Sequence, residues 1–175
     1  MVTITDPRRL DYCVHLLDSM MLARGDDRCE FRQDWLDERQ WLVVPVESMA
    51  RIPPADIPRL AEVLSQIKHG DTLALSTEPT SDLASCYSLE MSAVGLTECN
   101  RELGCFRFVL TDSEQSWAIS CTESYNLFAA RSSLLEAMLG KSIKEAVSEY
   151  RTFLLETGNG PESRLWALAA RYCAL

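Results

Sequence analysis

Basic residues are scarce in this sequence. Of 175 residues, 17 are Lys or Arg and 26 are Asp or Glu, so the formal net charge is −9 at pH 7. Proteins that bind DNA or RNA neutralise phosphates with basic side chains. This charge balance argues against nucleic acid as a partner.

Long apolar runs are missing as well. No stretch approaches the roughly 18 consecutive apolar residues of a membrane-spanning helix. Asp11, His15 and Asp18 interrupt the segment in which a signal peptide would carry its apolar region. Because 47% of the residues are apolar, they can still build one core. We therefore expect a single cytoplasmic domain over residues 1–175, with no membrane partner.

The sequence also lacks the spacing of a metal site. Its seven cysteines are an odd number without any C-x-x-C pair, and only His15 and His69 could supplement them. We predict buried, free thiols, no metal and no cofactor. One alternative stays open, in which Cys86 or Cys121 is a nucleophile activated by the distant His69.

Two local patterns resemble catalytic or phosphate-binding motifs. Residues 140–142 read Gly-Lys-Ser, but a phosphate-binding loop would have glycine where Leu135 stands, so the triplet predicts the junction of two helices. Asp11, His15 and Asp18 have the spacing of an oriented base, but they lie off the apolar stripe of the predicted helix. A solvated helix face is the better interpretation of these three residues.

The pattern of apolar and turn residues predicts an α+β fold. We expect an antiparallel sheet of about five to six strands packed against an N-terminal, a central and three C-terminal helices. The predicted strands are 28–40 (with a helix as the alternative), 41–46 as an edge strand, 71–77, 85–92, 94–102, 105–111 and 116–122. The predicted helices are 7–24, 57–70, 128–140, 142–158 and a last one that starts at 160.

The loop over residues 112–115 predicts a β-hairpin. If Thr111 pairs with Ser116, three pairs of side chains lie on one face of the hairpin and enter the core. These pairs are Phe106 with Cys121, Phe108 with Ile119, and Leu110 with Trp117.

Acidic residues are concentrated in the predicted strands. Residues 71–123 contain nine Asp or Glu and only two arginines. A field of one sign raises the rate of encounter with an oppositely charged partner. Acidic surfaces also keep a protein dispersed without any partner, so solubility is the simpler interpretation. The functional hypothesis is an acidic surface that binds a basic protein, with these candidate residues: Glu78, Asp82, Glu90, Glu98, Glu102, Asp112 and Glu114.

These features favour a protein-binding module, such as an inhibitor or adaptor that covers a basic partner, over an enzyme. Residues 117–140 resemble the strand-to-helix passages of bacterial immunity-type proteins, without a diagnostic motif. The alternative is a small cofactor-independent enzyme or a small-molecule-binding domain with a pocket between sheet and helices. Whether the protein forms a homodimer is left open.

Overall fold

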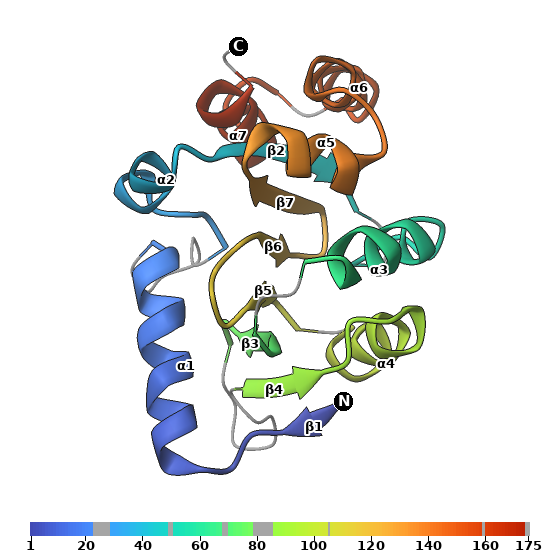
Figure 1. Cartoon of the computed structure of the whole chain (residues 1–175). Helices are drawn as coiled ribbons and strands as arrows, with labels where there is room; N and C mark the ends of the chain where they lie inside the picture. Colours follow the sequence, from blue (N-terminus) through green and yellow to red (C-terminus); the bar gives the residue numbers. More distant parts are fainter. Residues whose placement is uncertain are drawn as a thin grey trace.

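A computed structural model describes residues 1–22, 29–48, 51–67, 70–78, 86–104, 106–158 and 160–173. Within these ranges the chain forms an α+β structure with one antiparallel seven-stranded sheet and seven helices (Figure 1). The strand order across the sheet is β1-β4-β3-β5-β6-β7-β2. None of the helices in the described ranges is long and apolar enough to cross a membrane.

The strands are short and the helices surround them. The strands are β1 (Val2–Thr3), β2 (Leu42–Glu47), β3 (Thr72–Ser76), β4 (Cys86–Leu89), β5 (Phe108–Asp112), β6 (Ala118–Cys121) and β7 (Tyr125–Ala130). The helices are α1 (Pro7–Met20), α2 (Gln33–Arg39), α3 (Ile57–Ser65), α4 (Ala93–Leu103), α5 (Ser132–Leu139), α6 (Ile143–Glu156) and α7 (Arg164–Tyr172).

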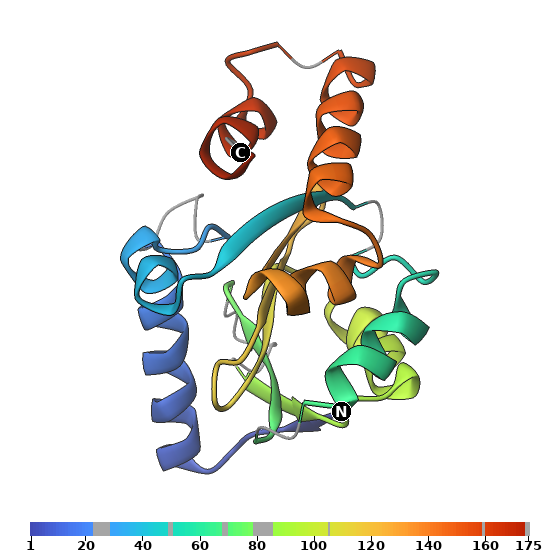
Figure 2. The same ribbon diagram turned by 45° about the horizontal axis from the view of Figure 1, so that its top comes forward.

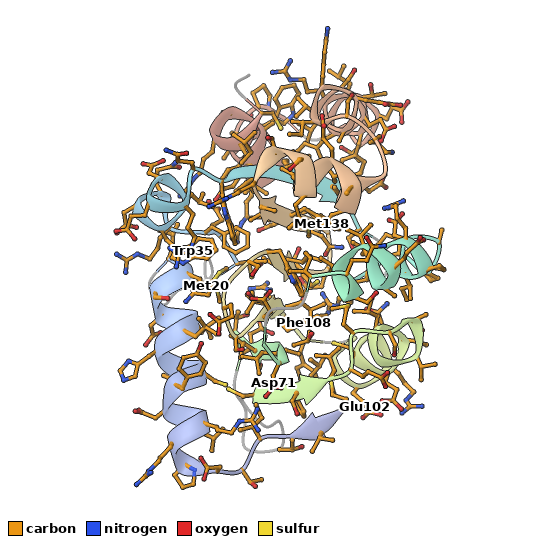
Figure 3. The ribbon with its side chains drawn as sticks, in the orientation of Figure 1. Met20, Trp35, Asp71, Glu102, Phe108 and Met138 are labelled. Atoms are coloured by element: carbon orange, nitrogen blue, oxygen red, sulfur yellow. The ribbon has the colours of Figure 1, made fainter. Side chains whose placement is uncertain are left out.

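Both faces of the sheet are covered, as Figure 2 shows for α1 and α2 on one side and α3, α4 and α5 on the other. Consecutive strand residues point to opposite faces, so each strand serves two cores. Phe108 belongs to the core beneath α3–α6, together with Met138, whereas Val109 belongs to the core beneath α1 and α2, together with Met20 and Trp35 (Figure 3).

Several predictions from local sequence signals are confirmed. β2 is the last strand in the sheet order, where Pro45 can be tolerated because an edge strand leaves one side unpaired. Gly140 ends α5 in the left-handed conformation with φ 69°. Ser142 then begins α6 by accepting a hydrogen bond from the backbone N–H of Glu145 at 3.2 Å. The Gly-Lys-Ser triplet is thus the junction of two helices.

Two predicted strands are helices in the structure. Residues 94–102 lie in α4, which Ser92 caps by accepting from the N–H of Gly95. The described part of 28–40 contains α2, in which Trp35 and Leu36 are buried together. Short apolar runs fit both periodicities, and here burial against the sheet favoured the helix.

The first and last thirds of the chain also differ from prediction. α1 buries Cys13, Leu16 and Met20, whereas Val14, predicted on its apolar stripe, is 42% exposed. The helix ends at Met20, and residues 23–24 lie outside the described ranges. Phe128 was predicted to be helical, yet it lies in β7, so the sheet gains a strand there.

The hairpin register is shifted by two residues from the predicted one. Phe108 pairs with Cys121 and Leu110 pairs with Ile119. Thr111 pairs with Ala118, and in the longer loop the N–H of Ser116 donates to the carboxylate of Asp112. An even shift preserves the faces. The predicted core face is therefore confirmed for all of the six residues except Phe106, which precedes β5.

Candidate functional site

Three of the predicted acidic residues lie near one end of the central strands. Thr72, the first residue of β3, pairs with Leu89 on one side and with Asp112 on the other. Glu90 and Glu114 follow these partners in sequence and are exposed. Asp112 itself is only 3% exposed, and its carboxylate accepts from the N–H of Ser116 at 2.8 Å. Asp112 therefore shapes the hairpin rather than presenting a charge.

The other candidates lie elsewhere. Glu78 follows the opposite end of β3 and lies 3.3 Å from Arg107. Glu98 and Glu102 are on α4, where Glu98 binds the N-terminal ammonium group and Glu102 pairs with Arg101 at 2.9 Å. Glu102 is near the C-terminal end of α4, which leads to the start of β5, whereas Asp71 precedes Thr72, the partner of Asp112 at the end of β5. Asp82 lies outside the described residues. The described candidates thus occupy three places and do not form one acidic face.

Hydrogen bonds fix the loop at the end of the sheet near Asp112 and Glu114. We call residues 112–117, which join β5 to β6, the tip loop. The hydroxyl of Thr111 donates to the carbonyl of Trp117 at 2.6 Å, and the N–H of Gln115 donates to the carbonyl of Asp112 at 3.0 Å. Gln115 has a left-handed backbone with φ 53°, which is uncommon for a residue other than glycine. Such a conformation persists where the surroundings determine it.

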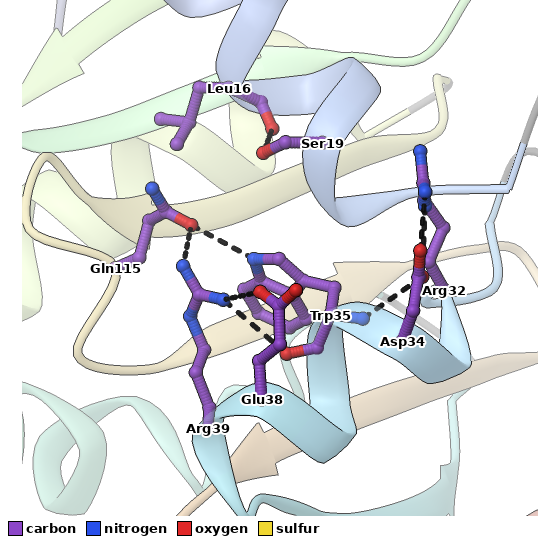
Figure 4. Close-up of polar contacts among 8 residues, drawn as sticks. All are labelled: Leu16, Ser19, Arg32, Asp34, Trp35, Glu38, Arg39 and Gln115. Atoms are coloured by element: carbon purple, nitrogen blue, oxygen red, sulfur yellow. Dashed lines mark hydrogen bonds and ion pairs between the residues drawn. The ribbon is translucent and has the colours of Figure 1, made fainter.

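Helix α2 supplies those surroundings (Figure 4). The side-chain carbonyl of Gln115 accepts from the indole N–H of Trp35 at 2.9 Å and from Nη2 of Arg39 at 2.7 Å. The Arg39 guanidinium also lies 4.6 Å from the centre of the Trp35 ring. Burial lowers the pKa of Arg39. The tip loop is therefore clamped to α2.

Helix α1 adds an exposed aromatic side chain. The hydroxyl of Tyr12 donates to the carbonyl of Ser113 at 2.5 Å, yet the residue is 45% exposed. Partial burial raises the pKa of Tyr12, and the negative charges of Glu114 and Asp112 raise it further. Tyr12 thus lies in the field of the acidic loop.

We call Tyr12, Glu38, Asp71 and Glu114 the tip surface. Asp71 is joined to the tip loop through its N–H, which donates to the hydroxyl of Ser113 at 3.1 Å, and its exposed carboxylate pairs with Arg9. On the α2 side, a depression of about 740 Å³ lies against the loop, lined by Glu38, Glu114 and two arginines among others. Charges are balanced in that depression, and on its other side Glu114 lies near Tyr12.

The catalytic alternatives gain little from the geometry. His15 is 77% exposed at its side chain and lies 3.6 Å from Asp11, as expected for a solvated face. The six described cysteines are buried and free, whereas His69 lies outside the described residues. Cys86 instead shares a hydrogen bond with Cys13, which holds the pKa of Cys13 below and that of Cys86 above the ordinary thiol value.

A cavity of about 220 Å³ does lie between the sheet and the helices, beside β2, α3 and α6. Phe128, Tyr150 and Phe153 contribute its aromatic lining. Four charged side chains of its lining form two ion pairs, Arg59 with Asp56 and Lys141 with Glu149, each at 2.7 Å. Within the described ranges, no group of three or more His, Cys, Asp or Glu residues could hold a metal ion.

Comparison with known proteins leaves the family open. No protein-family model matches the chain, and neither the curated proteins nor the solved structures give a significant match. The sequence indicated the tip loop through its turn residues and the acidic segment through its charge. It gave no signal for the contacts of Tyr12, Trp35 and Arg39 with that loop, since these residues are distant in sequence.

Proposed function

We propose that this protein is a binding module that recognises a basic segment of another protein through its tip surface. The observation that carries the proposal is the exposed Tyr12, held against the carbonyl of Ser113 in the field of Glu114. Tyrosine is enriched among residues that dominate binding energy, because it offers a large amphipathic contact area. Nearby exposed carboxylates increase the association rate of a cationic partner.

The clamp between α2 and the tip loop strengthens the proposal. A loop that is already fixed loses less conformational entropy when it binds. Gln115 uses its side-chain carbonyl for Trp35 and Arg39, so the neighbouring Glu114 is presented to solvent from a fixed backbone. A rigid ridge with an aromatic side chain and carboxylates suits protein recognition better than it suits catalysis.

Affinity capture with matched charge reversals tests this proposal. Wild-type protein, Glu114→Lys and Glu102→Lys are immobilised and exposed to a lysate at low and at high salt, and the retained proteins are identified by mass spectrometry. The two variants change the net charge equally, but Glu102 lies near the C-terminal end of α4, which leads to the start of β5, whereas the tip loop follows the end of β5. We expect basic proteins to be retained by wild type and Glu102→Lys, and to be lost from Glu114→Lys.

Two results would contradict the proposal. Equal loss from both variants would show that overall charge, rather than the tip surface, retains the basic proteins. Selective retention of acidic proteins would exclude a basic partner. For a partner retained as expected, Tyr12→Ala should accelerate dissociation, because the aromatic contact acts after the encounter.

A further inference from the structure

A second site is indicated at the opposite end of the central strands, around Arg51. This residue lies in the connection from β2 to α3, is 5% exposed and has a left-handed backbone with φ 59°. Its carbonyl accepts hydrogen bonds from the hydroxyl of Ser48 at 2.7 Å and from the side-chain amide of Asn126 in β7. The backbone of Arg51 is therefore fixed by the end of the sheet.

Helix α4 fixes the next residue. The side-chain carbonyl of Asn100 accepts from the N–H of Ile52 at 3.3 Å, and its amide donates to the carbonyl of Ile52 at 2.7 Å. Ile52 is fully buried. Ile52 lies outside helices and strands, so these two bonds satisfy backbone groups that would otherwise be buried without a partner. They also hold the neighbouring Arg51 near the end of α4.

The guanidinium group of Arg51 is only partly satisfied. Its Nε donates to the carbonyl of Gly104 at 2.8 Å, where the negative end of the α4 dipole compensates part of the charge. Its Nη1 is buried and has no hydrogen-bond partner among the described residues. Among the residues that the structure describes, no carboxylate forms an ion pair with Arg51. Guanidinium has five N–H donors, and a buried cation is normally paired with an anion.

Arg51 is one of the residues that line a groove. It has a volume of about 670 Å³ and runs between one face of α4 and the start of α3. Arg51 and Arg101 are its charged lining residues, and Arg101 is paired with Glu102, so within the described ranges the charge of Arg51 is the one left without a carboxylate. Its apolar lining comes from Pro54, Ile57, Pro58 and Ala93.

The first turn of α3 also lies beside the groove, and its N-cap residue makes no capping hydrogen bond with its side chain. The acids near the groove are already engaged. Asp56 pairs with Arg59 at 2.7 Å, and Glu102 pairs with Arg101 at 2.9 Å.

We propose that this groove binds a small organic anion, with a carboxylate or phosphate group at Arg51 and an apolar body against Pro54, Ile57 and Ala93. Arginine suits this role because its planar donors match both kinds of anion. This site is independent of the tip surface, and neither proposal requires the other.

Binding can be measured with defined probes by NMR titration of ¹⁵N-labelled wild-type protein at low ionic strength. Phenyl phosphate and benzoate distinguish the two head groups, inorganic phosphate tests the head group alone, and benzyl alcohol is the neutral control. We expect one of the two aromatic anions to bind more tightly than inorganic phosphate. The shifted amides should include Ile52, Thr97 and Gly104. Absence of binding by both aromatic anions, or equal binding of benzyl alcohol, would overturn the proposal.

Matched variants locate the charge. Arg51→Met should weaken the preferred anion by about tenfold or more, since a hydrogen bond to a charged group is lost. Arg8→Gln removes the same charge from the exposed surface of α1 and should leave binding unchanged. If Arg51→Met folds and binds the anion as wild type does, the proposal is wrong.

A second variant keeps the test decisive if Arg51→Met does not fold. Ala93→Trp introduces a bulky side chain at the exposed first turn of α4, at the apolar part of the groove and away from Arg51. It should weaken the aromatic anion severalfold more than inorganic phosphate. Equal affinities of wild type and Ala93→Trp for the aromatic anion would contradict the assigned groove.

Discussion

Gln115 and Arg51 hold the same rare backbone conformation at opposite ends of β5 and β6. Their φ angles are 53° and 59°, and neither is glycine. Each segment is fixed by side chains of a neighbouring helix, Trp35 and Arg39 of α2 for Gln115 and Asn100 of α4 for Arg51. Strained backbone of this kind persists only where tertiary contacts determine it.

The two segments differ in the charged group that these contacts leave available. Gln115 uses its own side chain in the clamp, and the exposed neighbour Glu114 provides the charge. At Arg51 the backbone makes the contacts, and the buried guanidinium keeps unused donors. A left-handed residue in a segment fixed by a neighbouring helix is therefore found beside an exposed negative charge at one end and carries a buried positive charge at the other.

The largest expected effect concerns the core that both ends share. Phe108 is fully buried at the start of β5, and Phe108→Ala should lower the free energy of unfolding by roughly 3 to 5 kcal/mol. Urea titration measures this loss. A value below about 1 kcal/mol would contradict the burial of this face and remove the common support of both ends.

Alkaline pH should act on the helix that holds the Arg51 segment. Burial raises the pKa of Cys99 on α4 to about 12 from 9.0. The folded state therefore retains a proton that the unfolded chain loses, so this contribution is complete below about pH 9 and disappears as the pH rises towards 12. Between pH 8 and pH 11, wild type should lose roughly 2 to 3 kcal/mol more stability than Cys99→Val. Equal pH profiles in urea titrations would contradict the burial of this thiol.

Substitution of Asn100 should affect the Arg51 end of the sheet and leave the tip surface unchanged. Asn100→Ala should destabilise the protein by about 2 kcal/mol, because the buried N–H and carbonyl of Ile52 lose their partners. Asn100→Asp keeps the acceptor for the N–H of Ile52 but places a carboxylate oxygen against the Ile52 carbonyl, so it should not restore the stability. Anion binding should weaken in Asn100→Ala, while retention of a basic partner should stay as in wild type. Equal loss of both activities would show that the two ends are coupled.

The smallest effect on stability is expected at Gln115, at the other end of the sheet. Gln115→Ala should lower stability by about 1 kcal/mol, since Trp35 and Arg39 lose their acceptor. Gln115→Gly loses the same bonds but adopts the left-handed backbone more easily, so it should be closer to wild type. If thermal unfolding shows glycine to be the worse substitution, the strain assigned to this turn is absent.

Local signals in the sequence account for much of the fold but not for the sites. The hairpin face, the edge position of Pro45 and the α5–α6 junction followed from turn residues, caps and alternation. The α4 region was misassigned because the apolar residues of 94–102 also fit a strand, although Ser92 with Gly95 forms a helix start. The contacts that fix the two ends could not be predicted. The Trp35–Gln115 and Arg51–Gly104 hydrogen bonds join segments that are distant in sequence and that only the folded sheet brings together.

We propose two separate sites of opposite charge at opposite ends of the sheet. One NMR experiment tests this proposal directly, in which ¹⁵N-labelled protein at low ionic strength is titrated first with phenyl phosphate or benzoate, whichever binds, and then with hexalysine. We predict that the anion shifts the amides of Ile52 and Gly104, and that hexalysine shifts those of Tyr12 and Gln115. Shifts of the same amides by both ligands, or hexalysine shifts centred on α4, would contradict the account.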